Sequence, residues 1–518
     1  MLVPYLLPFL AAATFAAPLE ERASNQAQKI PLGVLKSIGY RSPQTVETVA
    51  AATSGSVLAG PTACTTDCNS TLSFAGAQAA TYQVGNQLPG IPFKTRTSWA
   101  GEVPLNPVAG ASLDSYFFWM FGYEGGDAKT PSDSIVFWIQ GGPGCDSLSG
   151  LLQEVGPITY NYKGDTPTPN NYSWTLAADM VFPEQPLGVG FDNGIPTAYD
   201  ENDVGVAFGA FLDSFFSIFP ELKAKKLYIA AESYGGRYGP YISNYLIDQG
   251  SKYNFHGLLV VDGVVTDILL QEDVVTYQFV EANKEILKFT DADVETIRKD
   301  AESCGYIDYV NDNLKYPPKG KLPPYNEDGC NTFNDYYNIA SSKNPAFNIY
   351  KVDDTAHPPN VLGDANSPTQ FLNRTFYDNY DLQNYIHAPH KKWNVCNQGV
   401  FPNGDHSPAP DTNGVLQKVI EKSPAQRTVI INGQKDGLII SNGTSLALQN
   451  LTWNGGQGFS KSPFATTLIN SDGDASGWYT KERGLLYALV EKAGHEVPEY
   501  DPPAGFKLVQ YLLGQTTL

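Results

Sequence analysis

Positive charge is scarce in this chain of 518 residues: 34 Lys and Arg stand against 54 Asp and Glu, and the formal net charge is −20. Nucleic acids and anionic membranes repel a strongly acidic surface, so neither is expected as a partner. After residue 17 the chain also lacks an apolar run long enough to cross a bilayer, and no transmembrane helix is expected. Internal repeats and low-complexity blocks are absent as well. The composition is that of a globular protein with one large domain or a few domains.

Cysteine is sparse too, and no two cysteines have the C-x-x-C spacing of a zinc site. No metal and no organic cofactor are therefore implied. An even number of cysteines in an exported chain favours disulfides, but the spacing leaves their pairing open. The cysteines are Cys64, Cys68, Cys145, Cys304, Cys330 and Cys396.

The N-terminal segment MLVPYLLPFLAAATFAAPLEER is apolar as far as Ala17 and too short to span a bilayer. This pattern is typical of a cleaved secretory signal over residues 1–17, and a buried N-terminal segment is the alternative. Secretion is then expected, with a vacuole or lysosome-like compartment as the other destination. N-glycosylation sequons, each weak evidence alone, occur at Asn69, Asn171, Asn373, Asn442 and Asn450.

Short apolar runs that end in turns recur along the chain, at residues 134–140, 226–233 and 427–436. Each has the length of a buried strand, and an aromatic, strand-like run at 115–124 precedes them. Stretches of helical character, such as YGPYISNYLIDQG after the second run, separate them. This rhythm predicts a parallel α/β sheet with functional loops at the carboxyl ends of its strands.

Two other stretches differ from this rhythm. Residues 18–90 are rich in Ala, Ser, Thr and Gln, and we expect an N-terminal extension or a propeptide there. Residues 267–395 begin with a helical pattern and continue as a Tyr-, Asn- and Pro-rich tract. We expect this stretch to be an insertion that lies over the sheet, which leaves 91–266 and 396–518 as the two parts of the core.

Three residues with the chemistry of a serine hydrolase occur in the order Ser233, Asp436, His495. A hydroxyl becomes nucleophilic beside a base, and an imidazole base needs a carboxylate that fixes its tautomer. The order is that of the α/β-hydrolases. Each motif is weak alone, because Ala231 replaces the first Gly of G-x-S-x-G and AGHEVP is also compatible with an ordinary loop histidine.

A carboxylate lies directly before the nucleophile in AESYGG (231–236), where it does not obviously help a serine to attack. A solvated turn residue is the alternative for Glu232. The run GGPG (141–144) is likewise a plain tight turn when it is considered alone.

Taken in order, these motifs resemble those of the serine carboxypeptidases, the α/β-hydrolase family that removes C-terminal residues from peptides. The likeness covers residues 95–515. Five motifs of the family have counterparts here. WIQGGPGCDSLSGLLQEVGP (138–157) resembles W-x-N-G-G-P-G-C-S-S…E-x-G-P, and NYSWTLAADMVFPEQPLGVGF (171–191) resembles N-x-Y-S-W-N…Q-P-x-G-x-G-F. AESYGG (231–236) resembles G-E-S-Y-[AG]-G, GQKD (433–436) resembles G-D-x-D, and GHEVP (494–498) resembles G-H-M-V-P.

The resemblance implies an α/β-hydrolase fold with a largely helical, loop-rich cap insertion, and peptide or protein C-termini as substrates. It implies an acyl-enzyme mechanism at acidic pH, and a pKa of His495 low enough to keep part of the imidazole neutral in acid. It implies no cofactor and says nothing of the oligomeric state.

The resemblance also gives Glu232 a role. The family recognises the terminal carboxylate of its substrate with this Glu and the Glu of E-x-G-P, which here are Glu232 and Glu154. Two close carboxyl groups cannot both ionise cheaply, so one stays protonated and can donate to the substrate. Gln140 and Gly141 are expected beside them, with Gln140 in place of the family's Asn. A surface charge at a helix end is the alternative for Glu154.

The backbone N–H groups of Gly142 and Tyr234 are implied as the oxyanion hole. Gln434 replaces the first Asp of G-D-x-D, which matters little when Asp436 belongs to the triad. Glu496 replaces the commoner Met beside the pocket for the leaving residue, and we expect it to raise tolerance for C-terminal Lys or Arg. By the resemblance Cys145 pairs with Cys396, Cys304 with Cys330 and Cys64 with Cys68.

Three other functions use the same scaffold. An acyltransferase would pass the acyl group to an alcohol instead of water, and the motifs alone do not exclude it. A catalytically silent binding protein is disfavoured by the intact Ser, Asp and His. A general esterase is disfavoured by the pair of Glu154 and Glu232.

Overall fold

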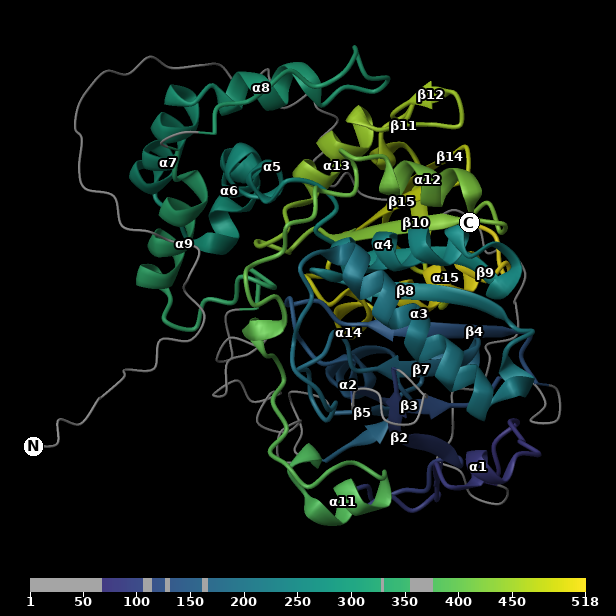
Figure 1. Cartoon of the computed structure of the whole chain (residues 1–518). Helices are drawn as coiled ribbons and strands as arrows, with labels where there is room; N and C mark the ends of the chain where they lie inside the picture. The colour runs from purple at the N-terminus through teal and green to yellow at the C-terminus, as the bar shows by residue number, and fades with distance from the viewer. Residues whose placement is uncertain (1–67, 106–113, 126–130, 161–165, 328–329, 355–375) are drawn as a thin grey trace, which may run out of the picture.

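The computed structural model describes residues 68–105, 114–125, 131–160, 166–327, 330–354 and 376–518. The predicted signal, Cys64 and Asn373 lie outside these ranges. A mixed β-sheet of eleven strands crosses the described part of the chain (Figure 1). In sheet order the strands are β1 (Gln83–Val84), β2 (Ser98–Pro104), β3 (Ser115–Phe121), β7 (Asp179–Pro183), β4 (Ser134–Ile139), β8 (Lys226–Glu232), β9 (Phe255–Val261), β10 (Thr428–Gly433), β15 (Leu485–Val490), β14 (Ala475–Glu482) and β13 (Thr467–Ile469).

The central strands from β7 to β15 run parallel, which confirms the α/β class. The two edges are antiparallel, and the sequence-based expectation of a parallel sheet did not include them. These edge strands mostly follow one another closely in the chain: only Arg483 and Gly484 separate β14 from β15, and both have positive φ. A two-residue hairpin of this kind imposes antiparallel pairing, whereas a parallel pair needs a long crossover.

Both faces of the central strands are buried, so these strands are apolar throughout. Along β4, Val136 and Trp138 belong to one hydrophobic cluster, and Ile135, Phe137 and Ile139 belong to the other. The alternation follows from the period of two in a strand, which points successive side chains to opposite faces. Two hydrophobic layers therefore enclose the sheet.

Helices cover both layers. The helices α3 (Glu201–Ile218), α4 (Gly235–Asp248) and α12 (Val415–Lys422) supply buried residues to one cluster. On the other face lie α2 (Ser147–Gly150), α14 (Val497–Tyr500) and α15 (Pro502–Leu512). The predicted helix after the nucleophile is α4, and the predicted strand before it is β8.

Between β9 and α12 the described part of the chain forms a largely helical insertion, which contributes most of a third hydrophobic cluster. In Figure 1 most of its helices lie to one side of the sheet. Its segment 349–352 contacts the loops after β10 and β15, because Gly437 N–H donates to Ile349 O (2.9 Å) and His495 N–H donates to Tyr350 O (2.7 Å). The helices are α5 (Ile268–Gln271), α6 (Thr276–Leu287), α7 (Asp291–Ser303), α8 (Tyr306–Asn313), α9 (Thr332–Lys343) and α11 (Tyr380–Tyr385).

Short elements also occur inside the stretch predicted as an N-terminal extension. The helix α1 (Ala77–Ala80) is followed by β1, which pairs with β2 at the edge of the sheet. At least this end of the stretch therefore packs on the core, and the boundaries of the extension and of the cap stay predictions.

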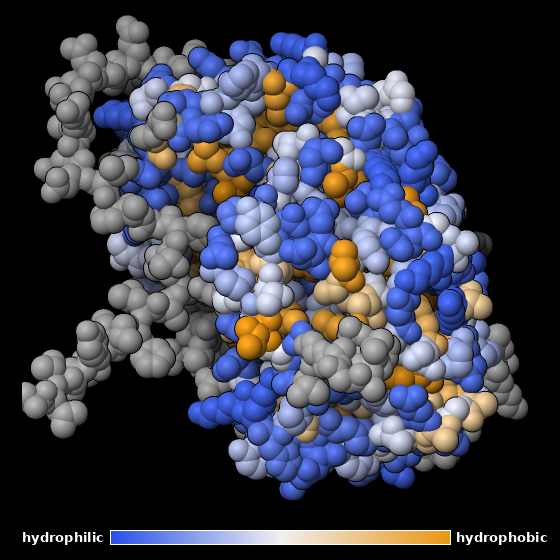
Figure 2. Space-filling view, viewed as in Figure 1, coloured by the Kyte–Doolittle hydropathy of each residue, from blue (hydrophilic) through white to orange (hydrophobic). Residues whose placement is uncertain are grey.

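Within the described ranges, no helix combines the length and the apolar character that a membrane crossing requires. On the face drawn in Figure 2, hydrophilic residues cover most of the coloured surface and hydrophobic residues form small groups between them. On this face, the residues exposed to solvent are therefore mostly polar or charged.

Candidate active site

Ser233 lies in a sharp turn between β8 and α4. Its φ is +60°, a left-handed conformation that a non-glycine residue adopts only where its surroundings enforce it. The backbone is held on both sides: Ser233 N–H donates to Val261 O (3.0 Å), and Ser233 O accepts from Gly236 N–H (2.8 Å) and Val264 N–H (2.9 Å). The side chain is 9% exposed at the carboxyl end of a central strand. The turn therefore presents a hydroxyl in a rigid frame.

The glycine-rich loop after β4 approaches this turn closely. A Cβ at Gly141 would collide with the backbone of Glu232 and Tyr234 and lie 2.8 Å from Ser233 Cβ, so only glycine fits. The N–H of Cys145 donates to Gly141 O (2.9 Å) and closes the loop. The peptide units that precede and follow Gly141 are thus brought next to the nucleophile.

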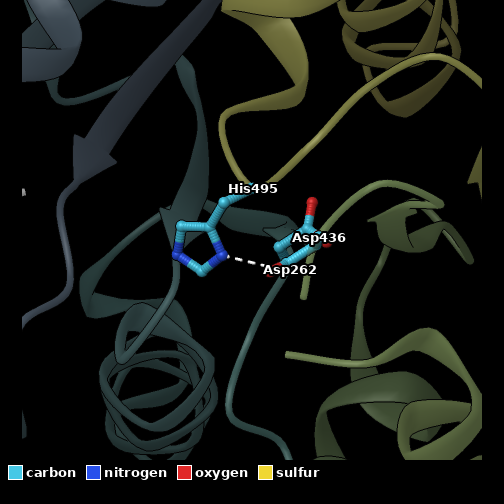
Figure 3. A group of neighbouring side chains, drawn as sticks. All are labelled: Asp262, Asp436 and His495. Atoms are coloured by element: carbon cyan, nitrogen blue, oxygen red, sulfur yellow. Dashed lines mark hydrogen bonds and ion pairs between the residues drawn. The ribbon is translucent and has the colours of Figure 1, made fainter. Parts of the chain in front are cut away.

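Asp436 and His495 form a buried pair in the loops after β10 and β15 (Figure 3). His495 Nδ1 lies 2.7 Å from Asp436 Oδ2. Asp436 Oδ1 accepts the N–H groups of Leu438 (2.8 Å) and Ile439 (3.1 Å), which fixes the carboxylate. The Nε2 atom of His495 is buried and has no hydrogen-bond partner among the described residues. An imidazole that donates from Nδ1 keeps Nε2 as a proton acceptor.

The pKa of His495 differs from the expectation that it lies low. Burial alone lowers it, but the charge and hydrogen bond of Asp436, followed by the charges of Glu496 and Glu232, outweigh burial and raise the pKa to about 9. These charges depend on pH. Burial raises the pKa of Glu496 to about 8, so in acid Glu496 is neutral and no longer raises the pKa of the imidazole.

Glu232 and Glu154 form a buried carboxyl pair beside the nucleophile. Gln140 Nε2 donates to Glu232 Oε1 (2.5 Å), and Trp138 Nε1 donates to Gln140 Oε1 (3.0 Å) and orients the amide. Burial and the facing Glu232 raise the pKa of Glu154 well above its usual range, and burial raises that of Glu232. Among the described residues, no third group donates to Glu154 Oε2 or to Glu232 Oε2. The pair therefore keeps a proton that a single carboxylate would release.

Glu154 owes its position to a π-helical turn, Leu151–Val155, that continues α2. Such turns widen the helix by one residue and are frequent at functional sites. Asn170 Nδ2 donates to the backbone oxygens of Glu154 (3.0 Å) and Gly156 (3.0 Å), which pins the end of the turn. The alternative of a surface charge is wrong, because Glu154 is buried.

Two further glutamates extend the acidic cluster. Glu496 is 1% exposed, and neither of its carboxyl oxygens has a hydrogen-bond partner among the described residues. Burial and the charges of Glu496 and Glu232 raise the pKa of Glu499 well above its usual range. Glu499 was missed by sequence reasoning, although it follows His495 by four residues and shares a short helix with Pro498.

Comparison with known proteins decides which family this geometry belongs to. A family profile described as serine carboxypeptidase matches residues 90–515. The chain belongs to this family. A probable serine carboxypeptidase of Arthroderma benhamiae is 35% identical over 460 residues, which cover 83% of this chain and 85% of that protein. Serine-type carboxypeptidase F of Aspergillus niger is 31% identical over 468 residues, which cover 83% and 86% of the two chains.

A solved structure supports the fold. The crystal structure of Kex1(Δ)p, a prohormone-processing carboxypeptidase of Saccharomyces cerevisiae, superposes with a TM-score of 0.65 at 22% identity. The match covers 85% of this chain and 97% of that one, so the α/β-hydrolase fold predicted from the serine carboxypeptidase motifs is confirmed.

One acidic residue next to the predicted triad was not expected from the sequence. Asp262 follows β9 directly, is fully buried and lies against Asp436 and His495 (Figure 3). Burial, and next the charge of Asp436, raise its pKa well above the usual range. A signal was present in the sequence: LLVVDG places a charged residue at the carboxyl end of an apolar strand, where α/β sheets carry their functional loops.

A second acid lies where this serine carboxypeptidase departs from the family signature, because Asp146 replaces the first Ser of C-S-S. Asp146 Oδ1 accepts Leu148 N–H (2.8 Å) and begins α2, and Oδ2 accepts Trp393 Nε1–H. Glu184 shares a hydrogen bond with Asp146; burial and that charge raise the pKa of Glu184 well above its usual range. Burial raises the pKa of Asp146 to about 6. A further shared proton therefore lies under the glycine-rich loop.

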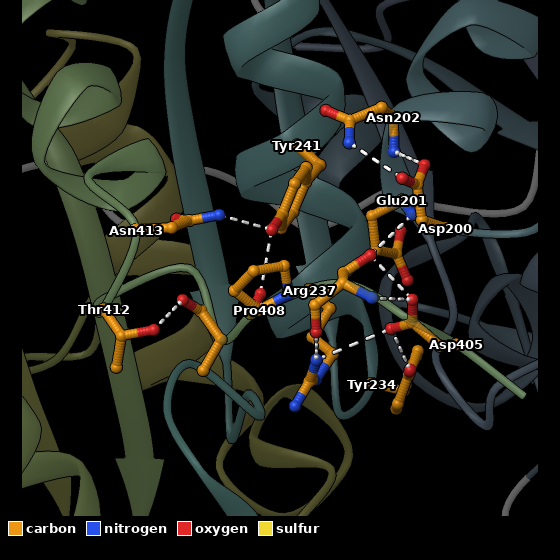
Figure 4. Close-up of polar contacts among 12 residues, drawn as sticks. Asp200, Glu201, Asn202, Tyr234, Arg237, Tyr241, Asp405, Pro408, Thr412 and Asn413 are labelled. Carbon is orange, nitrogen blue, oxygen red and sulfur yellow. Dashed lines mark hydrogen bonds and ion pairs between the residues drawn. The ribbon is translucent and has the colours of Figure 1, made fainter.

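Tyr234, the residue after the nucleophile, is fixed through its side chain (Figure 4). Its hydroxyl donates to Asp405 Oδ2 (2.6 Å), and Arg237 Nη1 lies 3.5 Å from the same oxygen. Arg237 Nη1 also donates to Ser407 O (3.0 Å). The segment that follows the cap is thus tied to the first turn of α4, which holds the peptide unit of Tyr234 in place.

Two of the expected disulfides are present, Cys145–Cys396 and Cys304–Cys330. The first joins the glycine-rich loop to the chain that returns from the cap, and the second lies within the cap. The Cys64–Cys68 pair stays a prediction, since Cys64 is outside the described residues. Among the sequons, Asn69 and Asn171 are exposed, and Asn442 and Asn450 are half-buried.

Proposed function

We propose that this serine carboxypeptidase family member cleaves the last peptide bond of peptides and proteins in acid, through an acyl-enzyme on Ser233. The buried pair of Glu154 and Glu232 carries the proposal, because it lies directly against the nucleophile turn and is supported by Gln140. A protonated carboxyl group donates a hydrogen bond to the terminal carboxylate of a peptide, whereas an ionised one repels it. A general esterase has no use for such a pair.

The proposed chemistry is that of a Ser-His-Asp triad, and the contact of His495 Nδ1 with Asp436 supports it. His495 Nε2 takes the proton of Ser233 Oγ as the oxygen attacks the carbonyl carbon of the last peptide bond. Asp436 stabilises the imidazolium that forms. The imidazolium then donates its proton to the departing amine, the C–N bond breaks and the terminal amino acid leaves. Water, deprotonated by His495, hydrolyses the ester and restores Ser233.

The N–H groups of Gly142 and Tyr234 are proposed to stabilise the oxyanion of the tetrahedral intermediate. The close approach of Gly141 to the nucleophile turn and the anchored side chain of Tyr234 support this role. Removal of one such donor from a serine hydrolase lowers kcat by roughly 10²–10³.

Glu496 is proposed to line the pocket of the leaving residue, because it follows His495 directly, is buried, and has two carboxyl oxygens without a partner in the part of the chain that the structure describes. Passage through the secretory pathway is proposed as well. The two disulfides and the exposed sequons at Asn69 and Asn171 support it, since disulfides persist in oxidising compartments.

The proposal is tested with one N-blocked dipeptide and its C-terminal amide, each assayed from pH 4 to 7 beside Ser233→Ala. We expect a strong preference for the free acid that fades as the pH rises, and no turnover by the serine variant. An activated ester with an alcohol acceptor is assayed in parallel. Equal turnover of acid and amide would contradict carboxylate recognition, and transfer to the alcohol in place of hydrolysis would make the chain an acyltransferase.

A further inference from the structure

We propose that Asp262 is a positioning residue of this active site, which holds Asp436 through a shared proton and thereby sets the pH at which His495 becomes a base. The proposal rests on the triad of the proposed function. It extends the chain of Ser233, His495 and Asp436 by one acid, contributed by the strand next to the nucleophile strand.

The position of Asp262 leaves it few roles other than this one. It is fully buried, and one oxygen of Asp262, one of Asp436 and a ring nitrogen of His495 all lie within 4.8 Å of one another (Figure 3). The Asp262 carboxyl group accepts Gly433 N–H (2.9 Å to Oδ1) and Asn432 Nδ2–H (3.1 Å). These donors belong to β10, the strand that leads into the Asp436 loop. Asp262 thus contacts both the end of β10 and Asp436 in the loop that follows it.

The backbone indicates that the aspartate is maintained against a local cost. Asp262 has a φ of +41°, in the left-handed region that favours glycine and that, among other residues, asparagine and aspartate adopt most readily. A buried carboxyl group in that conformation, directly against a second carboxyl group, persists only where its surroundings demand it. The favourable counterpart proposed here is the hydrogen bond that a neutral Asp262 carboxyl group donates to Asp436.

Few other ionisable groups face Asp262. Asp436 faces it from the loop after β10, His495 from the loop after β15, and Tyr487 from β15 itself. In turn Asp436 acts on Glu272 and Tyr336 of the cap. No lysine or arginine is among these groups. Two adjacent carboxylates without a cation other than the imidazolium repel each other, so the proton stays between them.

The shared proton has a direct consequence for the base. Asp262 in its neutral form donates to Asp436, which withdraws negative charge from the oxygen that faces His495. A weaker negative charge stabilises the imidazolium less, so the pKa of His495 falls. A lower pKa keeps more of the imidazole neutral in acid, which is the form that accepts the proton of Ser233. Asp262 therefore helps a serine hydrolase to work at low pH.

Two substitutions separate this role from a purely structural one. Asp262→Gly removes the donor, and Asp262→Asn keeps a neutral donor to Asp436 and an acceptor for Gly433 N–H. Both residues tolerate a positive φ, so neither adds backbone strain. The readout is the rate of inactivation by a serine-directed phosphonate as a function of pH. It reports the protonation of His495 whether or not the enzyme turns out to cleave peptides.

We expect the acid limb of the inactivation profile to move to higher pH by about one unit in Asp262→Gly and to stay at its wild-type position in Asp262→Asn. Asp411→Asn is the matched control, because Asp411 is another aspartate with a pKa raised by burial, to about 7, and its contact is to Thr266. Its profile should coincide with that of the wild type.

Equal shifts in the Asn and Gly variants, or an unmoved acid limb in Asp262→Gly, would overturn the proposal. A uniform loss of rate at every pH would assign Asp262 a structural role only. If Asp262→Gly does not fold, a displaced acid limb in Asp262→Asn still overturns the proposal, because this variant keeps the neutral donor to Asp436. Failure of the dipeptide assay with normal phosphonate profiles would reject the peptidase function and leave this inference intact.

Discussion

Shared protons link the most unusual residues of this enzyme. Three pairs of buried carboxyl groups lie in or under the active site, and in each pair the pKa of at least one member is raised by burial and by its neighbour. Neutral carboxyl groups donate hydrogen bonds and ionised ones do not, so a site built from such pairs performs best in acid. The pairs are Glu154 with Glu232, Asp262 with Asp436, and Asp146 with Glu184.

The first residue prediction concerns carboxylate recognition. Glu154→Leu removes the donor and leaves Glu232 free to ionise, so kcat/KM for a free-acid dipeptide should fall by about 10–100-fold, mostly through KM. Glu154→Gln keeps a neutral donor and should lose much less. It should also retain its preference for the free acid up to pH 7. Steady-state kinetics on the dipeptide and its amide between pH 4 and 7 measure both effects.

The amide substrate is the internal control, because it lacks the charge that the pair recognises. Its kcat/KM should change little in either variant. An equal loss on acid and amide would mean that Glu154 supports the fold of the loop and not the substrate.

The second residue prediction concerns the leaving residue. The pKa of Glu496 is raised to about 8, so its negative charge appears only as the pH rises. The ratio of kcat/KM for C-terminal Lys over Leu should therefore increase from pH 4 to 7 in the wild type, on the order of tenfold, and stay flat in Glu496→Met. Release of Lys and Leu from paired peptides measures the ratio.

Glu491→Met is the control for this change, since Glu491 is an exposed glutamate of the same segment. Its ratio should follow that of the wild type. A Lys-to-Leu ratio that is the same in Glu496→Met and the wild type at every pH would exclude Glu496 from the pocket.

Sequence reasoning identified the residues whose neighbours in the chain carry a signature. Ser233, Glu232 and His495 lie in short motifs, and the motif chemistry predicts their roles. The role of Asp262 was not predicted, because its partner, Asp436, is far away in the chain and the contact depends on the pairing of β9 with β10. The raised pKa of His495 was not predicted for the same reason, since it depends on carboxylates from several loops.

At the scale of elements, Asp146 connects three parts of the chain: the glycine-rich loop, α2 and the segment that carries Trp393. Asp146→Ala removes a helix cap and leaves the indole N–H without an acceptor. We expect the free energy of unfolding to fall by about 2–4 kcal/mol, and by less than half of that in Asp146→Asn. Urea unfolding of both variants at pH 5 measures the difference.

Asp213→Ala provides the comparison, because Asp213 pairs with Lys252 at the surface (2.7 Å), and the Tyr253 hydroxyl that also donates to Asp213 has a second acceptor in Gly209 O (2.9 Å). Exposed pairs contribute little, so this variant should lie within about 0.5 kcal/mol of the wild type. Equal stabilities for Asp146→Ala and Asp213→Ala would show that the loop does not depend on its buried acid.

The predictability of each element depended on its environment. The strands β4, β8 and β10 are buried on both faces and are therefore apolar throughout, which made their positions clear from composition. The strands β1 and β13 are two and three residues long and lie at the edges of the sheet, where no apolar run is required. Their place in the sheet follows from pairing with a neighbour and not from their own residues.

For the whole molecule, the raised carboxyl pKa values determine whether the free energy of unfolding rises or falls with pH. A carboxyl group whose folded pKa is raised keeps its proton in the native state after the unfolded chain has released it. Stability therefore falls as the pH rises from about 4 towards the folded pKa. The raised pKa of His495, about 9, acts in the same direction above pH 6.5. The folded pKa values are about 6 for Asp146 and about 8 for Asp192, Glu272 and Glu496.

We predict that the free energy of unfolding is larger at pH 5 than at pH 8. Each pH unit between a folded and an unfolded pKa corresponds to about 1.4 kcal/mol, and several groups contribute. Urea midpoints of Ser233→Ala, which prevents self-digestion, measure the difference between the two pH values. A midpoint that is higher at pH 8 would show that the carboxyl groups ionise freely in the native state.

The amino-acid sequence alone sufficed for the class of fold, the order of the catalytic motifs and the scarcity of positive charge, because strand burial, turn chemistry and net charge are properties of local composition. The tertiary structure decided which carboxyl groups meet. Asp262 reaches Asp436, and Glu154 reaches Glu232, through strands and loops that only folding brings together. A shared proton is a property of two groups at one distance in one buried environment, and the linear order of residues specifies neither the distance nor the burial.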